Sequence, residues 1–338
     1  MSHAPETDSP SNNTVSNNTV TNDANDASRF VAERPRLLGL AYRITGSRVD
    51  AEDVVQEAWL RWNANHLDVE RPQAWLTTVT ARLSLDRCRA IERQRLSYVG
   101  PWLPEPVRTE LPLSTLSESG DPAERVETLD SLRIGLLVLL GELNAVDRVV
   151  IVLVDVLALS FSEVADVVDR SSGACRQIAV RARRRLHDRM AEPSEIRQHA
   201  NSAEAWRLAG ELLTAIGTGD PAAVLPLLTS GVVLTSDGGP NHRAARRPVI
   251  GPDRVARFLV NIGGRISASA TLEPCSINES PGMIVSQDDA PTFALITEVS
   301  DGIDRIWIVI NPDKLRALTF EELHRTTPAG DAATRTAT

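Results

Sequence analysis

The stretch LALSFSEVADVVDRSSGACRQIAVRARRRL, residues 157–186, holds the pattern that decides the fold around it. Ser160 and Glu163 stand three residues apart where its first helix should begin. This spacing suits a capping box, in which each side chain accepts a hydrogen bond from the other residue's backbone N–H. Asp169 to Gly173 then interrupt the apolar pattern, and a second helical arc follows, made of Cys175, Ile178, Ala182 and Leu186. Two short helices joined by a tight turn are typical of a helix-turn-helix.

The second of these helices has a cationic face opposite its apolar arc. Between Arg170 and Met190 there are seven arginines and one acid, in a chain whose formal net charge is -9. A basic charge set against the overall balance favours DNA over a face that merely keeps the helix soluble. Side chains of the first turn should reach base edges, and later arginines should meet phosphates. The predicted DNA contacts are Ser172, Arg176, Gln177, Val180, Arg181 and Arg184.

Composition argues against several other classes of protein. No apolar run approaches the roughly 20 residues that cross a bilayer, and no signal pattern opens the chain, so we expect a cytoplasmic protein without a membrane contact. Three distant cysteines and six histidines without paired spacing predict no disulfide framework, no metal site and no cofactor. The only lysine, Lys314, follows Asp313 where a Walker phosphate loop needs glycine, and no G-x-S-x-G motif occurs. No catalytic residue is therefore predicted.

The composition also changes along the chain, and it predicts a multidomain protein. Residues 1–27 and 321–338 have little to bury and are expected to be disordered tails. Helical periodicity predicts all-α domains over 28–96 and 121–190, joined by a proline-rich linker over 97–120. The linker contains YVGPWLPEP (98–106), whose aromatic residues should pack against another part of the chain. Short apolar runs between glycines and prolines predict an α+β domain with a curved antiparallel sheet over 200–320.

The helix expected after Gly46, capped by Asp50, carries an acidic face that includes one apolar residue. Its members are Asp53, Gln56, Glu57 and Leu60. A solvated acidic face with a stray leucine is common, and a docking surface for a basic partner explains the pattern equally well.

A second basic helix follows a polar loop, Asn63 to Arg71. Pro72 suits the first position of this helix, which should run to about Arg95. A solvated surface is the simpler interpretation, but arginines beside an asparagine-containing loop also suit unstacked, single-stranded bases. The residues concerned are Asn63, Asn65, His66, Arg82, Arg89 and Arg93.

Three stretches taken together resemble the extracytoplasmic-function sigma factors of bacterial RNA polymerase. They are DAEDVVQEAWLRW (50–62), RPQAWLTTVTARLSLDRCR (71–89) and LSFSEVADVVDRSSGACRQIAVRARRRL (159–186). The resemblance implies that core RNA polymerase and promoter DNA are the partners. It places the acidic face of residues 53–60 on the polymerase, the loop and helix of residues 63–95 on the -10 element, and the helix-turn-helix on the -35 element.

The YVGPWLPEP linker and the C-terminal segment resemble the subgroup of these factors that carries a SnoaL-like domain. Other SnoaL-like domains are cyclases and isomerases with a pocket acid or base, and Asp237 is the nearest candidate here. The subgroup has a DGGGK motif where this chain has SDGGPN (236–241), without the lysine, and it shares the closing NPDKL (311–315). The resemblance therefore implies a regulatory domain, open to a small-molecule or protein effector. Its expected contacts with the linker or the sigma half are Trp102, Asp237, Gly238, Gly239, Asn311, Pro312, Asp313 and Lys314.

Two other functions remain open at the level of sequence. A ligand-responsive repressor would use the same helix-turn-helix without polymerase, but it would need neither the acidic face nor the second basic helix. A SnoaL-like isomerase or cyclase with an accessory DNA-binding half would need a set of pocket acids and bases, and the sequence offers only scattered candidates.

Overall fold

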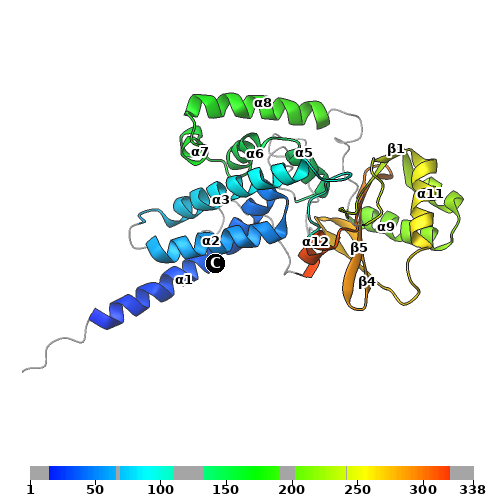
Figure 1. Cartoon of the computed structure of the whole chain (residues 1–338), viewed down its shortest axis with the longest axis horizontal. Coiled ribbons are helices and arrows are strands. Elements are labelled where there is room, and N and C mark those ends of the chain that lie inside the picture. Colours follow the sequence, from blue (N-terminus) through cyan, green and yellow to red (C-terminus); the bar gives the residue numbers. More distant parts are fainter. Residues whose placement is uncertain (1–14, 66–68, 110–131, 191–201, 241, 320–338) are drawn as a thin grey trace, which may run out of the picture.

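The computed structural model describes residues 15–65, 69–109, 132–190, 202–240 and 242–319 of the 338-residue chain. Two groups of helices lie side by side, and a domain built on a sheet follows them (Figure 1). In Figure 1 the sheet domain lies at one end of the molecule, and α12 lies between the sheet and the helical part. Within the described residues, no helix is long and apolar enough to cross a membrane.

The first helical group consists of α1 (Val15–Thr45), α2 (Arg48–Asn65) and α3 (Pro72–Arg95). Its core is formed by side chains such as Leu37, Trp62 and Leu76, each at most 1% exposed. Gly46 follows the end of α1, and its φ of 68° lies in the left-handed region that glycine adopts without strain. Pro72 opens α3, as the sequence predicts.

Three expectations about this group are wrong. Residues 15–27 do not form a disordered tail throughout, because α1 already begins at Val15; a nucleated helix gains one hydrogen bond for each residue it adds. Asp50 is not the cap of α2, since the helix begins at Arg48 and the Ser47 Oγ accepts the hydrogen bond from Asp50 N at 3.0 Å. Asn63 and Asn65 lie in the last turn of α2 rather than in a loop.

The second helical group consists of α5 (Ile134–Gly141), α6 (Ala145–Ile151), the π-helical η2 (Val152–Val156), α7 (Phe161–Val168) and α8 (Ser172–Met190). Both hydrogen bonds of the Ser160–Glu163 capping box are present, and Asp169 ends α7 in the left-handed conformation. The predicted apolar arc of α8 is buried, with Cys175 and Ala182 fully enclosed. The helix-turn-helix is thus confirmed.

The sheet domain begins with α9 (Ser202–Gly217), α10 (Pro221–Val224) and η3 (Leu225–Leu227). Its strands are β1 (Leu228–Asp237), β2 (Val249–Ile250), β3 (Thr271–Ile277), β4 (Ser280–Gln287), β5 (Ala290–Val299) and β6 (Ile303–Val309). α11 (Pro252–Gly263) lies between β2 and β3 in the chain, and α12 (Pro312–Leu315) and η4 (Arg316–Thr319) follow β6.

The strands form one mixed sheet in the order β2-β1-β6-β5-β4-β3. The expectation of an antiparallel sheet is wrong for one pair, because β1 and β6 run parallel while the other pairs are antiparallel. No tight hairpin joins β1 to β6, so no turn dictates their relative direction.

The two faces of the sheet are covered by different parts of the chain. One face packs against α9 and α11 through residues such as Leu212 and Leu259. On the other face, Ile284, Ile296 and Trp307 share a core with Leu103 of the linker and Ile134 of α5. The sheet domain therefore shares hydrophobic core with the helical half of the chain.

Candidate nucleic-acid interface

α8 presents its predicted DNA face to solvent. Its buried arc packs on α5, α6 and α7, and this packing fixes which side of the helix points outward. The outward residues are exposed, and Val180 is 60% accessible. The structure places Ser172, Arg176, Gln177, Val180, Arg181 and Arg184 on this surface.

Ion pairs separate the arginines of α8 into two kinds. Arg183 binds Asp155 of η2, which raises the pKa of its guanidinium, and Arg185 lies 3.4 Å from Asp147 of α6. These two arginines hold α8 on its own group of helices. Arg176 instead lies 5.3 Å from the centre of the Phe161 ring, and Arg184 is 3.9 Å from Asp188, a separation at which an exposed pair contributes little.

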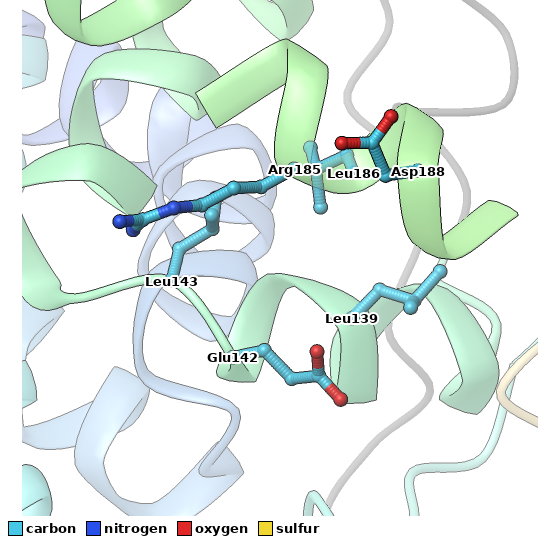
Figure 2. A pocket seen from close by; sticks show the side chains of 6 residues that line it. All are labelled: Leu139, Glu142, Leu143, Arg185, Leu186 and Asp188. Atoms are coloured by element: carbon cyan, nitrogen blue, oxygen red, sulfur yellow. The ribbon is translucent and has the colours of Figure 1, made fainter. Parts of the chain in front are cut away.

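A cavity of about 370 Å³ lies beside α8, on the side that faces α5. Figure 2 shows side chains of α8 opposite those of α5 and the turn after it; the cavity is lined by Leu139, Glu142, Leu143, Arg185, Leu186 and Asp188. None of the predicted DNA contacts lines it, so this cavity is separate from the DNA face.

The residues predicted to contact single-stranded bases do not form one cluster. Asn63 and Asn65 are exposed at the end of α2, and His66 lies outside the described residues. Arg93 lies about 30 Å along α3 from Pro72, at 1.5 Å per residue. Arg82 donates to the backbone oxygen of Asp166 in α7 at 2.6 Å. Arg89 pairs with Asp86 at 3.1 Å.

The acidic face of α2 is exposed but partly neutralised. Leu60 is 57% accessible, and Gln56 is also exposed. Arg61 binds Glu57 at 2.9 Å, and Arg87 of α3 lies 3.3 Å from Asp53. The face therefore presents an apolar residue surrounded by acids that already have exposed partners.

The linker is held by a buried charge cluster in the sheet domain. Asp237, at the end of β1, accepts hydrogen bonds from Leu103 N at 2.9 Å, from the Lys314 ammonium at 2.6 Å and from the Tyr98 hydroxyl. The Lys314 Nζ also donates to the Leu103 oxygen and lies 3.9 Å from the centre of the Trp102 ring. The only lysine of the sequence thus joins the linker to β1.

This environment changes the acidity of its members. Burial lowers the pKa of Lys314 to about 8, although Asp237 opposes the effect. Burial and the neighbouring Asp237 raise the pKa of Tyr98. Both groups therefore hold their protons at neutral pH.

The other residues expected in this contact have different positions. Gly239 has a φ of 65°, and a Cβ there would lie 2.8 Å from Asn311 Cγ, so only glycine fits. A Cβ on Gly238 would lie 2.7 Å from the His242 oxygen, which belongs to the sheet domain itself. Asn311 donates to the Tyr98 hydroxyl at 3.0 Å, and Pro312 opens α12. Asp313 is exposed and pairs with Arg316 at 2.6 Å, and no hydrogen bond joins its side chain to the described part of the linker.

Two polar residues that the sequence analysis did not single out also join distant parts of the chain. Glu105 of the linker accepts from Arg48 N at 2.6 Å and Val49 N at 3.1 Å, so it caps α2. Glu298 of β5 accepts from Gly135 N at 3.0 Å, at the start of α5. Burial raises the pKa of both carboxyl groups. Glu105 could have been noticed in the sequence because it stands between Pro104 and Pro106 of the linker, whereas no local pattern marks Glu298.

Asn278, in the turn between β3 and β4, is a third such residue and is completely buried. Its amide donates to the Tyr42 hydroxyl and to the Leu132 oxygen, each at 2.8 Å, and its Oδ1 accepts from Val107 N at 3.2 Å. One side chain thus contacts α1, the linker and the segment that enters α5. Its φ of 51° suits an asparagine in a tight turn, but nothing local predicts its partners.

The two helical groups are also bound directly to each other. Arg95 of α3 donates to the Gly141 oxygen at 2.9 Å, and Arg148 of α6 donates to the Ile44 oxygen at 2.8 Å. α3 packs on α6 and α7. We call this packing, together with the contacts between the sheet domain, the linker and α5, the closed arrangement.

Comparisons with known proteins match most of the chain. The sigma-70 region 2 model matches residues 30–94, and the sigma-70 region 4 model matches residues 133–186. The ECF RNA polymerase sigma factor SigJ of Mycobacterium tuberculosis strain H37Rv is 35% identical over 90% of this chain and 97% of its own length. The probable ECF RNA polymerase sigma factor SigI of Mycobacterium tuberculosis strain CDC 1551 is 30% identical over 86% of this chain and 94% of its own length. The crystal structure of SigJ matches with a TM-score of 0.64 and 33% identity, covering 87% of this chain and all of that one.

Proposed function

The chain belongs to the extracytoplasmic-function family of RNA polymerase sigma factors, and from the exposed faces of its helices we propose how its parts divide promoter-directed transcription initiation. The observation that carries the proposal is α8, whose buried arc leaves Arg176 and Gln177 exposed in its first turns. We assign α8 to the -35 element. Arg176 and Gln177 contact base edges, with Ser172 and Val180 beside them, and Arg181 and Arg184 contact phosphates.

We assign the acidic face of α2 to core polymerase. Leu60 supplies an apolar contact, and Asp53, Gln56 and Glu57 surround it. The exposed ion pairs made by Arg61 and Arg87 contribute only about 0–1 kcal/mol each, so polymerase can displace them.

We assign contacts with the -10 element to the exposed residues of α2 and α3. Asn63, Asn65, Arg89 and Arg93 can receive DNA as they stand, and we include His66 from the sequence. Arg82 joins them only after it leaves the Asp166 oxygen of α7. Binding at -10 is therefore coupled to separation of the two helical groups.

A closed arrangement cannot contact both promoter elements at once. Their names place them about 25 base pairs apart, hence about 85 Å along B-DNA. α3 and α7, however, are in contact. We propose that the sheet domain regulates the factor by stabilising the closed arrangement. We call the state in which the helical groups and the sheet domain have separated the open arrangement. An effector would release the factor only by binding the open arrangement more tightly than the closed one.

We assign regulation, rather than catalysis, to the sheet domain. The carboxylate of Asp237, its nearest candidate for a catalytic acid, is occupied by Tyr98, Leu103 and Lys314. Because the partner polymerase works on the chromosome, we place the chain in the cytoplasm.

Run-off transcription with purified core polymerase tests these assignments. The full chain should yield promoter-specific transcripts that the core enzyme alone does not produce. Leu60→Asp should weaken assembly with the core enzyme and change the free energy of unfolding by at most about 0.5 kcal/mol, because the side chain is exposed. Leu272→Asp, at a residue 51% accessible on β3, is the matched control and should assemble normally. If the core enzyme gains no promoter-specific initiation, the proposal is wrong.

A further inference from the structure

The sheet domain carries a dense group of arginines that the assignments above do not use. Between residues 243 and 265 there are six arginines and one acid, Asp253, in a chain of net charge -9. All six are exposed: Arg243, Arg246, Arg247, Arg254, Arg257 and Arg265. We call them the arginine surface.

The fold points these arginines away from the core. α11 buries Val255, Ala256 and Leu259 against the sheet, and at 100° per residue Arg254 and Arg257 lie on the opposite side. The first three arginines lie in the segment that enters the edge strand β2, where the backbone of Arg246 lies beside Gly100 of the linker. Gly251, with a φ of 93°, then turns the chain from β2 into α11. Figure 1 shows α11 on the side of the sheet domain that is farthest from the helical groups.

The arginine surface also lacks internal counter-charges. The other exposed arginines in the described part of the sheet domain are paired, Arg207 with Glu211 and Arg316 with Asp313, both at 2.6 Å. In the described part of the chain, no carboxylate lies within 4.0 Å of any of the six guanidinium groups, and none of them donates a hydrogen bond. Such a concentration of one sign of charge favours a polyanionic partner.

We propose that the arginine surface binds the phosphate backbone of promoter duplex upstream of the element that α8 contacts. This inference rests on the proposed function. Guanidinium groups match phosphate geometry, and contacts of this kind are independent of base sequence. Phe258 is half-buried and is the only Phe, Tyr or Trp from residue 242 to 265, so the surface lacks the stacking platforms that single strands require.

Once the sheet domain has left its packing on α5 and the linker, the tether between α8 and the sheet domain allows this contact. Residues 191–201 separate α8 from α9, and a chain of that length spans at most about 40 Å. This is close to one turn of B-DNA, about 34 Å. The sheet domain can therefore reach the duplex next to the α8 site.

The test measures DNA binding by the full chain assembled with core polymerase. Two promoter fragments are compared, one that ends just upstream of the -35 element and one that extends about three helical turns further. Arg254→Gln with Arg257→Gln is compared with Arg207→Gln with Arg316→Gln, which removes the same charge from paired arginines. Each lost phosphate contact makes the slope of log K against log salt shallower by about 0.9. On the long fragment, the α11 variant should lose affinity several-fold and have a slope shallower by about 1 to 2, whereas the short fragment and the control variant should show no change.

The contrary outcomes are distinct. Equal losses of affinity on both fragments would mean that the arginines contact an acidic protein surface. An unchanged slope of log K against log salt would mean that they contact neither DNA nor such a surface. Each result overturns the inference while promoter binding persists. If the unaltered chain with core polymerase shows no promoter-specific binding on either fragment, the proposed function fails and the inference fails with it.

Discussion

At the scale of single residues, Lys314 has the most unusual surroundings. Its side chain is 6% accessible, and burial lowers its pKa from 10.5 to about 8. The unfolded chain keeps this proton up to the higher pKa, so between pH 8 and 10 it binds more protons than the folded chain does. The contribution of Lys314 to the free energy of unfolding therefore rises with pH across this window, while Cys88 and Cys175, whose pKa values burial raises, act in the opposite direction. Tyr98, whose pKa is raised, lowers the free energy of unfolding with rising pH only above this window.

We predict that this rise disappears in Lys314→Met. A pKa lowered from 10.5 to about 8 corresponds to at most about 3 kcal/mol. Denaturant unfolding of the unaltered chain and of Lys314→Met between pH 8 and 10 measures the free energy of unfolding of each. The difference between the two curves of free energy against pH isolates Lys314 from the other titrating groups. Parallel curves would show that the ammonium is not buried in the folded chain.

At the scale of elements, α8 leads to a prediction about promoter choice. Arg176→Ala and Gln177→Ala should alter the preference among -35 sequences, because good base contacts are worth about 1–3 kcal/mol of discrimination. Arg184→Ala should weaken binding to all sequences alike, with a shallower salt dependence, because phosphate contacts carry no base identity.

Binding of each variant to matched and scrambled -35 fragments, at several salt concentrations, checks this division. Arg183→Ala is not a suitable control, because it also removes the ion pair to Asp155 that holds α8 in place. Equal losses on matched and scrambled fragments for all three variants would refute the division.

The same element shows what local sequence can predict. The capping box, the turn at Asp169 and the buried arc depend on residues within a few positions of one another, and all three are present. The cap of α2 was missed because Ser47 and Asp50 are both acceptable caps by spacing. The length of α2 was underestimated because asparagine discourages a helix interior but is tolerated in a last turn.

At the scale of the whole molecule, Asn278 carries the prediction. Replacing it with alanine leaves Leu132 O and Val107 N without their partner, at a cost of about 1–3 kcal/mol for each unsatisfied group. We predict that Asn278→Ala loosens the closed arrangement, so that small-angle scattering shows a larger radius of gyration while promoter preference is unchanged. Asn261→Ala, at an exposed asparagine of α11, controls for loss of an amide. An unchanged radius would mean that Asn278 does not hold the parts together.

Sequence could not predict this junction. Tyr42 and Asn278 are 236 positions apart, and neither residue has a local pattern that marks a partner. The parallel pairing of β1 with β6 was missed for the same reason, since β6 is remote from β1 and no turn connects them. The residues at the linker contact were instead named through a family resemblance, which reports on distant contacts without deriving them.

The parallel pair has a consequence for synthesis on the ribosome. β6 is the last described strand, yet it lies between β1 and β5, so the sheet cannot close until residues 303–309 have emerged. Lys314, which clamps the linker, emerges later still. Domains generally fold from the N-terminus as they are made. Every newly made molecule therefore passes through a period in which its DNA-binding helices are complete but unrestrained, and the clamp closes only after Lys314 has emerged from the ribosome.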